Sequence, residues 1–339
     1  MSLDYLPWQA PAAGAAVEAA GDVRWVRLPV PGSLQHINVW LAPGRSGRIL
    51  IDTGMNQPDT QAAWQQLIVT ERLQRELTAI LVTHHHPDHF GMAGDLAGRF
   101  GVPVRMSTAA RAAAERSLAP LNGASGSALS DYRDTWGVDF EALLGSARAT
   151  GTLEKLLSGM PPAAPCILEG ERIAELRDAW QASLHFGHAD GHVCLHWPAG
   201  ELFIGGDQLL PAISSNVSLY PGLASTDPLG DFLASLERLA QLPGETIVLP
   251  AHGQPFRGAA ERVAQLQAGH EQRLARLSDF TAEPRTTTEV VTALFGTRNL
   301  EGWNRLLAFG ETLAHVRYLH RRAALTRLTD GGEVRWQRA

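Results

Sequence analysis

The sequence has few of the features that mark secreted, membrane-spanning or disulfide-stabilised proteins. Its 339 residues include two cysteines, Cys166 and Cys194, which provide no disulfide framework and are compatible with two reduced thiols. No run of about 18 apolar residues is present, so we expect no membrane-spanning helix. The first residues have neither a basic start nor an apolar stretch long enough for a signal peptide. A cytoplasmic location is therefore the default expectation.

Positive charge is also scarce. Lys155 is the only lysine and all other basic side chains are arginine, which we interpret as compositional bias. The net charge of -6 argues against a protein that binds nucleic acid or a membrane surface over its whole length. The bulk charge instead favours a small or neutral partner.

Several common catalytic motifs are missing. The chain has no Gly-x-Ser-x-Gly elbow, no Walker phosphate loop and no dinucleotide-binding fingerprint. At 339 residues with 45% hydrophobic side chains, it can bury a sizeable core but is too long for a typical single domain. We expect one main domain with an appendage.

The first hundred residues predict antiparallel strands followed by alternating helices and strands. Apolar and polar residues alternate in the early segments, and residues 79–82 form a continuous apolar run typical of a buried central strand. Loops at the ends of such strands are where functional sites assemble. The predicted strands span residues 23–28, 37–41, 48–51, 79–82 and 102–106, and the predicted helices span 58–74 and 90–100.

Residues 107–165 predict a helical insert, because Ala-rich helical segments alternate there with loops such as 122–126 and no strand pattern appears. Strand patterns then resume and predict a second antiparallel half. Those strands span residues 172–176, 180–186, 193–197, 202–204 and 246–249, with a helix at about 229–242.

The last part of the chain predicts helices and a hairpin. A Thr before a Glu near residue 286 resembles a helix-capping signal, and Asp330-Gly331-Gly332 predicts the hairpin turn. The helices are expected at about 259–277, 286–295 and 304–321, and the strands at 325–328 and 334–336. This order is a winged-helix pattern, so we predict a catalytic domain at 1–256 and a winged-helix-like domain at 257–339.

The strongest chemical signal is the run from Thr83 to His89, THHHPDH, directly after the predicted strand 79–82. His84 and His86 are two residues apart on an extended segment, so both imidazoles can point the same way. Pro87 keeps His86 out of the α conformation. Two side chains can therefore reach one metal ion.

Asp88 and His89 extend this signal to a second metal ion. They follow at the expected start of a helix, where Asp88 is a natural N-cap, and they can turn toward an ion beside the first. We interpret His85, which points the opposite way from its neighbours, as structural or exposed. The spacing His-x-His-x-Asp-His is a strong metal-site signal.

A site for two ions needs more ligands than these four, and three candidates follow later strands. His188 lies in a glycine-flanked loop, Asp207 ends the strand-and-turn 202–207, and His252 follows an apolar strand. A carboxylate such as Asp207 can bridge two cations. All three candidates lie at strand ends, which strengthens the prediction.

This ordered set of seven residues resembles the metallo-β-lactamase superfamily, especially its glyoxalase-II-like and lactonase-like hydrolases. The resemblance covers about residues 20–256 and implies an α/β fold, the αββα sandwich. It also implies how the ligands divide. His84, His86 and His188 would bind one metal, Asp88, His89 and His252 would bind the other, and Asp207 would bridge them.

The resemblance leaves some residues with two open roles. Leu50 to Gly54 matches a family element, in which Asp52 either orients a metal ligand or only forms the turn. His192 either contacts a ligand or is structural. Asp190 departs from the small residue or proline often found at its position, so the local loop can differ.

Other departures narrow the function. The commonest zinc β-lactamases replace one ligand by Cys or use a different third motif, so antibiotic hydrolysis is a poor first choice. The short interval between Asp207 and His252 leaves no room for the large extra domain of the nucleases of this superfamily. The C-terminal appendage resembles that of lactamase-beta-like hydrolases, a branch that includes a mitochondrial endoribonuclease.

The expected mechanism needs no Ser or Cys nucleophile. Two divalent cations about 3.5–4 Å apart can hold a bridging water whose pKa falls toward about 7, which supplies hydroxide at neutral pH. We expect attack on a polarised carbonyl, with Asp88 as the proton shuttle and Asp207 as the second catalytic residue. Zinc best fits the His and Asp ligands, and iron or manganese is compatible with them.

The leading hypothesis is hydrolysis of a small thioester, lactone or simple ester. The insert 107–165 and the loop 209–216 would form the pocket wall, where Ser214 and Asn216 either donate hydrogen bonds or are ordinary turn residues. The insert and the C-terminal helices are also candidate contacts of a homodimer.

The alternative is a phosphodiesterase acting on RNA, because residues 257–339 contain 13 Arg against 9 Asp and Glu, an excess of four. This excess is mild, and Arg321-Arg322 is the only adjacent basic pair. We therefore predict a small-molecule substrate and expect nucleic acid only as the second choice. A non-catalytic metal-binding module is the third.

Overall fold

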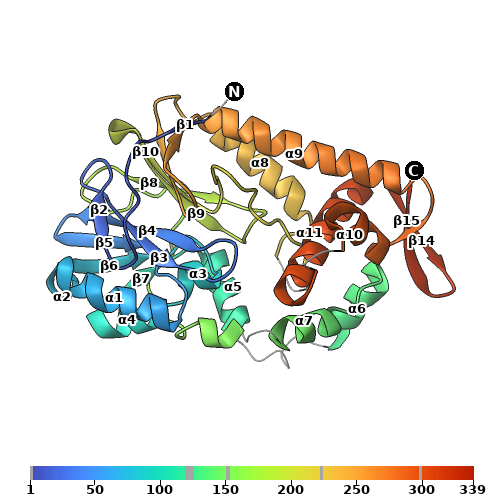
Figure 1. The fold of residues 1–339 in the computed structure, drawn as a ribbon, viewed down its shortest axis with the longest axis horizontal. Coiled ribbons are helices and arrows are strands. Elements are labelled where there is room, and N and C mark those ends of the chain that lie inside the picture. The colour runs from blue at the N-terminus through green and yellow to red at the C-terminus, as the bar shows by residue number, and fades with distance from the viewer. Residues whose placement is uncertain (1–2, 119–125, 150–152, 222–223, 298–299) are drawn as a thin grey trace.

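The computed structural model describes residues 3–118, 126–149, 153–221, 224–297 and 300–339 (Figure 1). Two six-stranded sheets pack face to face. The first has the order β2-β3-β4-β5-β6-β7, antiparallel from β2 to β5 and parallel from β5 to β7. Its strands are β2 (Ala16–Glu18), β3 (Arg24–Pro29), β4 (His36–Gly44), β5 (Gly47–Ile51), β6 (Leu77–Leu81) and β7 (Val104–Arg105).

The second sheet has the order β1-β12-β11-β10-β9-β8. Its neighbouring strands are antiparallel except for the parallel pair β10 and β11. The strands are β1 (Asp4–Tyr5), β8 (Gln181–His185), β9 (His192–Trp197), β10 (Leu202–Gly206), β11 (Ile247–Pro250) and β12 (Phe256–Arg257). The first strand of the chain therefore pairs with one that follows it by about 250 residues.

Helices cover the outer face of each sheet. The first sheet carries α1 (Pro58–Thr70), α2 (Leu73–Glu76), α3 (Pro87–Phe90) and α4 (Ala93–Phe100), and the second carries α8 (Pro228–Leu239) and α9 (Ala259–Phe280) (Figure 1). Side chains alternate along the strands: Trp25 and Trp40 stack between the sheets, whereas Val26 and Leu28 face the cluster that contains Trp64 of α1. The fold is the αββα sandwich that the family resemblance implied.

The insert is helical, as expected, with α5 (Thr108–Leu118), α6 (Gly126–Trp136), α7 (Phe140–Ala149) and the 3₁₀ turn η2 (Leu153–Leu156). The expected loop at 122–126 lies outside the described residues except for Gly126. Figure 1 shows α6 and α7 beside the C-terminal elements. Trp136 of α6 stacks on Trp336 with 5.6 Å between the ring centroids, and Arg327 donates a hydrogen bond to the carbonyl of Thr135.

The C-terminal elements follow the predicted order. They are β13 (Arg285–Thr286), α10 (Thr287–Phe295), α11 (Gly302–Arg321), β14 (Leu325–Asp330) and β15 (Glu333–Arg338), with the sheet order β13-β15-β14. The capping box is confirmed, because Thr286 and Glu289 each accept the backbone N–H of the other. One hydrophobic cluster joins Phe203 of the second sheet to Leu313 and Trp336. The winged-helix interpretation and the domain boundary after residue 256 stay predictions.

Two local expectations were wrong. Residues 172–176 form a turn with isolated bridges, because Ile173 and Leu176 are both buried and the Leu176 N–H bonds back to the Ile173 carbonyl. Asp88 is not the N-cap of the helix, since His86 holds that position and Pro87 begins α3.

In the part of the chain that the structure describes, no helix is long and apolar enough to cross a bilayer. Cys166 and Cys194 are both free.

Candidate metal centre

The seven residues singled out in the sequence converge at one end of the sandwich and fall into two groups. One group is His84, His86, His188 and Asp207, and the other is Asp88, His89 and His252. Within each group, one nitrogen or oxygen atom of every side chain lies within 4.8 Å of those of the others. Segments separated by more than 150 residues therefore meet there.

The first group is built from the end of β6 and the loop after β8. His86 has extended backbone angles, φ -63° and ψ 149°, as the following proline requires. Its Nδ1 lies 2.9 Å from Nε2 of His84, and His188 Nε2 lies 3.2 Å from the same His84 atom. Three imidazole nitrogens thus point toward a common position.

The second group combines α3 with the loop after β11. Asp88 Oδ2 lies 3.2 Å from Nε2 of His252 and 3.7 Å from Nε2 of His89. All three side chains are at least largely buried. This is the donor set that first-row divalent metals prefer in proteins.

Asp207, at the end of β10, lies between the two groups. Its Oδ2 is 3.4 Å from His188 Nε2, and its Oδ1 is 3.3 Å from His89 Nε2 and 3.4 Å from His252 Nε2. One carboxylate therefore contacts donors of both groups, which is the arrangement that a bridging ligand needs.

The pKa values of the histidines differ between the two groups. Burial lowers the pKa of His84 and His86 well below the usual histidine range, so these imidazoles are neutral and can donate lone pairs. Burial also opposes protonation of His89, but the carboxylates of Asp207, Asp52 and Asp88 outweigh it and raise the pKa of His89 well above that range. The second group thus attracts positive charge.

Three buried donor atoms give a test of whether metal ions fit. His89 Nε2, His252 Nε2 and Asp207 Oδ1 are buried and have no hydrogen-bond partner among the described residues. Buried polar atoms are normally paired, so each such atom needs an explanation. Bound divalent cations would satisfy all three, and the imidazole and carboxylate donors fit them.

Further contacts orient the ligand side chains. Asp52 follows β5, and its Oδ2 lies 2.7 Å from Nδ1 of His89, which leaves His89 Nε2 facing the second group. The Thr83 backbone N–H and hydroxyl donate to the same carboxylate. The geometry agrees with the orienting role that the sequence left open for Asp52.

His192 also contacts the centre. Its Nε2 accepts a hydrogen bond of 3.1 Å from the backbone N–H of Asp207, and its ring stacks on that of His84 at 4.7 Å. His192 therefore contacts the candidate ligands Asp207 and His84, which is one of the two roles that the sequence left open. His85 belongs to neither group of donors, as expected. Asp190 is buried and accepts a hydrogen bond from Arg116.

Sequence analysis missed Asn38 of β4, which holds the loop that carries His252. The Asn38 amide donates to the carbonyls of Pro250 and Gly253, both at 2.9 Å, and accepts from the indole of Trp25 at 2.8 Å. The Nδ1 atom of His252 lies 2.7 Å from the carbonyl oxygen of His36. A polar residue inside a strongly apolar strand was the one available signal.

The loop after β10 contacts His188 of the first donor group. Asn216 accepts a hydrogen bond of 2.7 Å from His188 Nδ1 through its backbone carbonyl, and its amide donates to Glu311 of α11 at 3.0 Å. Ser214 donates only to the adjacent carbonyl of Ser215. Sequence analysis had left Asn216 as either a hydrogen-bond donor or a turn residue, and it had not identified Glu311.

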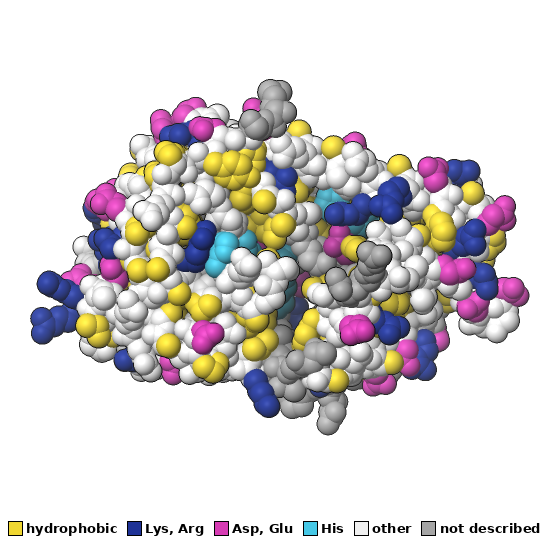
Figure 2. Space-filling model, viewed as in Figure 1, with side chains coloured by type: hydrophobic (Ala, Val, Ile, Leu, Met, Phe, Trp, Pro, Cys, Tyr) yellow, Lys and Arg dark blue, Asp and Glu magenta, His cyan; other side chains and the backbone are white. Residues whose placement is uncertain are grey.

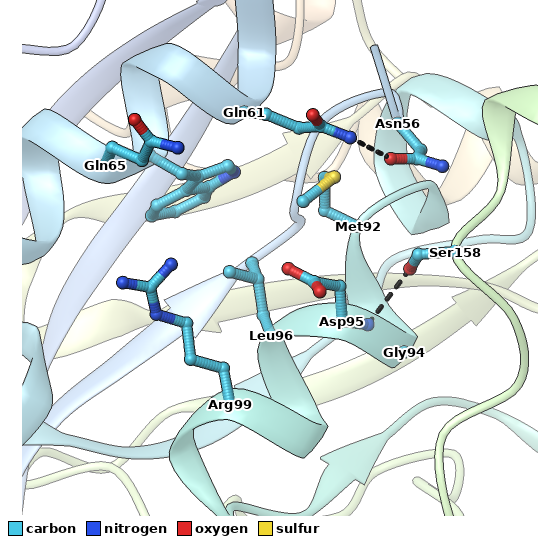
Figure 3. A pocket seen from close by; sticks show the side chains of 10 residues that line it. Asn56, Gln61, Gln65, Met92, Gly94, Asp95, Leu96, Arg99 and Ser158 are labelled. Atoms are coloured by element: carbon cyan, nitrogen blue, oxygen red, sulfur yellow. Dashed lines mark hydrogen bonds between the residues drawn. The ribbon is translucent and has the colours of Figure 1, made fainter. Parts of the chain in front are cut away.

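The surface of the molecule has a hollow in which histidines are visible. Figure 2 shows a hollow between the sheet-built part of the molecule and the helical part on the right, with His side chains visible at its edge. A separate pocket of about 500 Å³ lies between α1 and α4, where Gln61 bonds Asn56 and the Asp95 N–H bonds Ser158 (Figure 3). None of the seven residues lines that pocket, so it is distinct from the candidate centre.

Comparison with known proteins identifies the family. A family model described as the metallo-β-lactamase superfamily matches residues 32–252, well over half of the chain. The chain belongs to the metallo-β-lactamase superfamily. A second model, for the C-terminal domain of metallo-β-lactamase-like proteins, matches residues 274–339. Because it belongs to this superfamily and its relatives are named as hydrolases, the protein is a metallo-hydrolase.

Individual relatives support this assignment over 62% to 99% of the chain. The probable metallo-hydrolase YqjP of Bacillus subtilis is 27% identical over 326 residues, which cover 92% of this chain and 97% of the relative. A hydroxyacylglutathione hydrolase of Fuscovulum blasticum is 25% identical over 212 residues, 62% of each chain. The crystal structure of a β-lactamase domain protein from Burkholderia ambifaria is 33% identical, with a TM-score of 0.89 over 99% of this chain and 98% of that one.

Proposed function

We propose that the protein is a binuclear metal-dependent hydrolase of a small ester-like substrate: a thioester, a lactone or a simple ester. The observation that carries this proposal is the pair of donor groups that share Asp207. We further propose zinc as the metal, with iron or manganese compatible with the same donors. A cytoplasmic location and a homodimer stay predictions.

When bound, two divalent cations supply a hydroxide nucleophile at neutral pH and polarise the substrate carbonyl. The protein holds the donors in place: Asp207 contacts both groups, and Asp52 presents the Nε2 atom of His89. Asp88 has a partly exposed carboxylate 3.2 Å from His252, and the histidines beside it, against the effect of burial, lower its pKa. Asp88 is therefore ionised at neutral pH. Because a lowered pKa weakens a carboxylate as a base, we assign Asp88 the proton shuttle on its position beside His252.

Two observations favour an ester-like substrate over RNA. The first is the Fuscovulum relative, whose name gives an acylated thiol as its substrate. The second is the C-terminal part of the chain, where several of the described arginines that the RNA alternative counts contact other groups of the protein. Arg317 and Arg321 donate to Thr226, and Arg322 pairs with Asp227 at 2.9 Å. A surface that grips nucleic acid keeps its positive charge free for phosphates.

A substrate panel tests the proposal. The metal-loaded protein would be assayed against matched thioesters, lactones, simple esters and phosphodiesters, with the Asp207→Ala variant as the control. We expect turnover of at least one carboxylic ester class and none by the variant. Turnover of phosphodiesters alone, together with salt-dependent binding of single-stranded RNA, would contradict the proposal.

A further inference from the structure

The loop of residues 216–220 lies between the metal centre and the C-terminal helices. On the inner side, the Asn216 carbonyl accepts the Nδ1–H of His188 at 2.7 Å. This bond places the proton on Nδ1 and leaves the Nε2 lone pair facing Asp207 and His84. The position of the loop therefore sets the orientation of His188.

On the outer side, hydrogen bonds to distant parts of the chain hold the loop, and three of them are 3.0 Å or shorter. The Leu219 N–H donates to the carbonyl of Gly310 at 3.0 Å, and the hydroxyl of Tyr132 donates to the Leu219 carbonyl at 2.8 Å. The third is the bond from the Asn216 amide to Glu311 at 3.0 Å. The helical insert and α11 thus both clamp the loop.

Gly310 shows how closely α11 approaches. A Cβ atom at this position would lie 2.5 Å from Cε1 of Tyr220 and 2.7 Å from the hydroxyl of Ser218. Glycine inside a helix is destabilising relative to alanine. Its presence at the centre of α11 suits direct contact between the helix and the loop.

Glu311 brings a charged group to this contact. Glu311 is 9% exposed. Its carboxylate pairs with Arg273 of α9 at 3.1 Å and accepts a hydrogen bond from the Asn216 amide. Ser218 donates its hydroxyl to the amide oxygen of Asn216. The Asn216 side chain is therefore held at both ends, with its nitrogen toward Glu311.

We propose that Glu311 is a positioning residue for the metal ligand His188 and acts through Asn216, so that the C-terminal helices are part of the active site. The proposal rests on the metal centre of the proposed function but not on the substrate class. A His188 ring that loses its fixed orientation binds metal more weakly, and contacts of this kind contribute roughly 10- to 100-fold in metal affinity. Because Glu311 acts through one intermediate residue, we expect the lower end of that range.

The test measures zinc affinity of the full chain by competition with a chromophoric chelator. Glu311→Ala should weaken zinc binding about tenfold. Glu311→Gln keeps an oxygen that can accept the Asn216 amide, and it should retain most of the affinity. Thr312→Val is the matched control: it alters the adjacent buried residue of α11, whose hydroxyl has no partner among the described residues, and it should bind zinc like the wild type.

A double-mutant cycle separates positioning from a general effect on folding. If Glu311 acts through Asn216, then the double variant Glu311→Ala/Asn216→Ala binds zinc no more weakly than Asn216→Ala alone. Wild-type affinity in Glu311→Ala, or losses that multiply in the double variant, would overturn the proposal. Should Glu311→Ala fail to fold, wild-type affinity in Asn216→Ala would overturn it equally. Ester turnover plays no part in these readouts, so a wrong substrate class leaves them interpretable.

Discussion

Replacement of Asp52 by Asn probes how the protein prepares a metal ligand. Asp52 is buried and has a left-handed backbone with φ of 64°, a conformation that asparagine also adopts readily. The substitution therefore preserves shape and backbone, and it changes one oxygen to an NH₂ group. The expected effect is on His89, whose Nδ1 lies 2.7 Å from that carboxylate.

The hydrogen bonds show why the effect should be large. The Thr83 backbone N–H needs the remaining oxygen at position 52 as its acceptor, so the new NH₂ group faces His89 Nδ1. In the variant, the NH₂ group at position 52 and the Nδ1–H of His89 are both donors. They conflict unless the proton of His89 moves from Nδ1 to Nε2, which is the atom that faces Asp88 and Asp207. Loss of such an orienting contact costs roughly 10- to 100-fold in metal affinity, which is about 1.4–2.7 kcal/mol.

The assay is zinc affinity of the variant, measured by chelator competition after complete removal of metal. Asp95→Asn is the matched control, because it removes the same charge from an exposed position on α4 that is in neither donor group. Wild-type affinity in Asp52→Asn would refute the reasoning. It would mean that the metal selects the His89 tautomer without help from Asp52.

Three further predictions concern Asp207, Asn38 and the buried histidines His270 of α9 and His315 of α11, two of whose ring nitrogens lie 3.1 Å apart. Asp207→Ala should lower the metal content, measured by elemental analysis, together with any hydrolysis, and an active variant would contradict the site. Asn38→Ala removes the partner of the buried Trp25 indole N–H and of the Pro250 carbonyl, and should lower the free energy of unfolding by about 2 kcal/mol or more, measured by urea denaturation. Burial lowers the pKa of His270 to about 3 and of His315 to about 4, so the unfolded chain binds more protons below pH 6.5 and stability falls as pH decreases from there toward 4. His270→Gln should make that slope shallower by about 1.4 kcal/mol per pH unit, and an unchanged slope would show that His270 does not contribute.

Much of the fold could be predicted because its signals are local. Alternation of apolar and polar residues predicted a strand at residues 23–28, and the structure has β3 there, with Trp25 between the sheets and Val26 toward the helical layer. The failed strand at 172–176 has its buried residues three apart, a spacing that suits a turn better than a strand. Short pairings such as β1 with β12 leave no local pattern, since two residues are too few to show a period.

The sequence by itself determined the chemistry of the site. Metal ligation requires particular donor atoms, and the run from His84 to His89 with His188, Asp207 and His252 contains them at strand ends, where side chains leave the core. Tertiary structure decided how these donors are held. Asn38 reaches Pro250 across 212 residues and Glu311 reaches Asn216 across 95, because hydrogen bonds to backbone carbonyls and amides depend on position in space and leave no trace in the order of the chain.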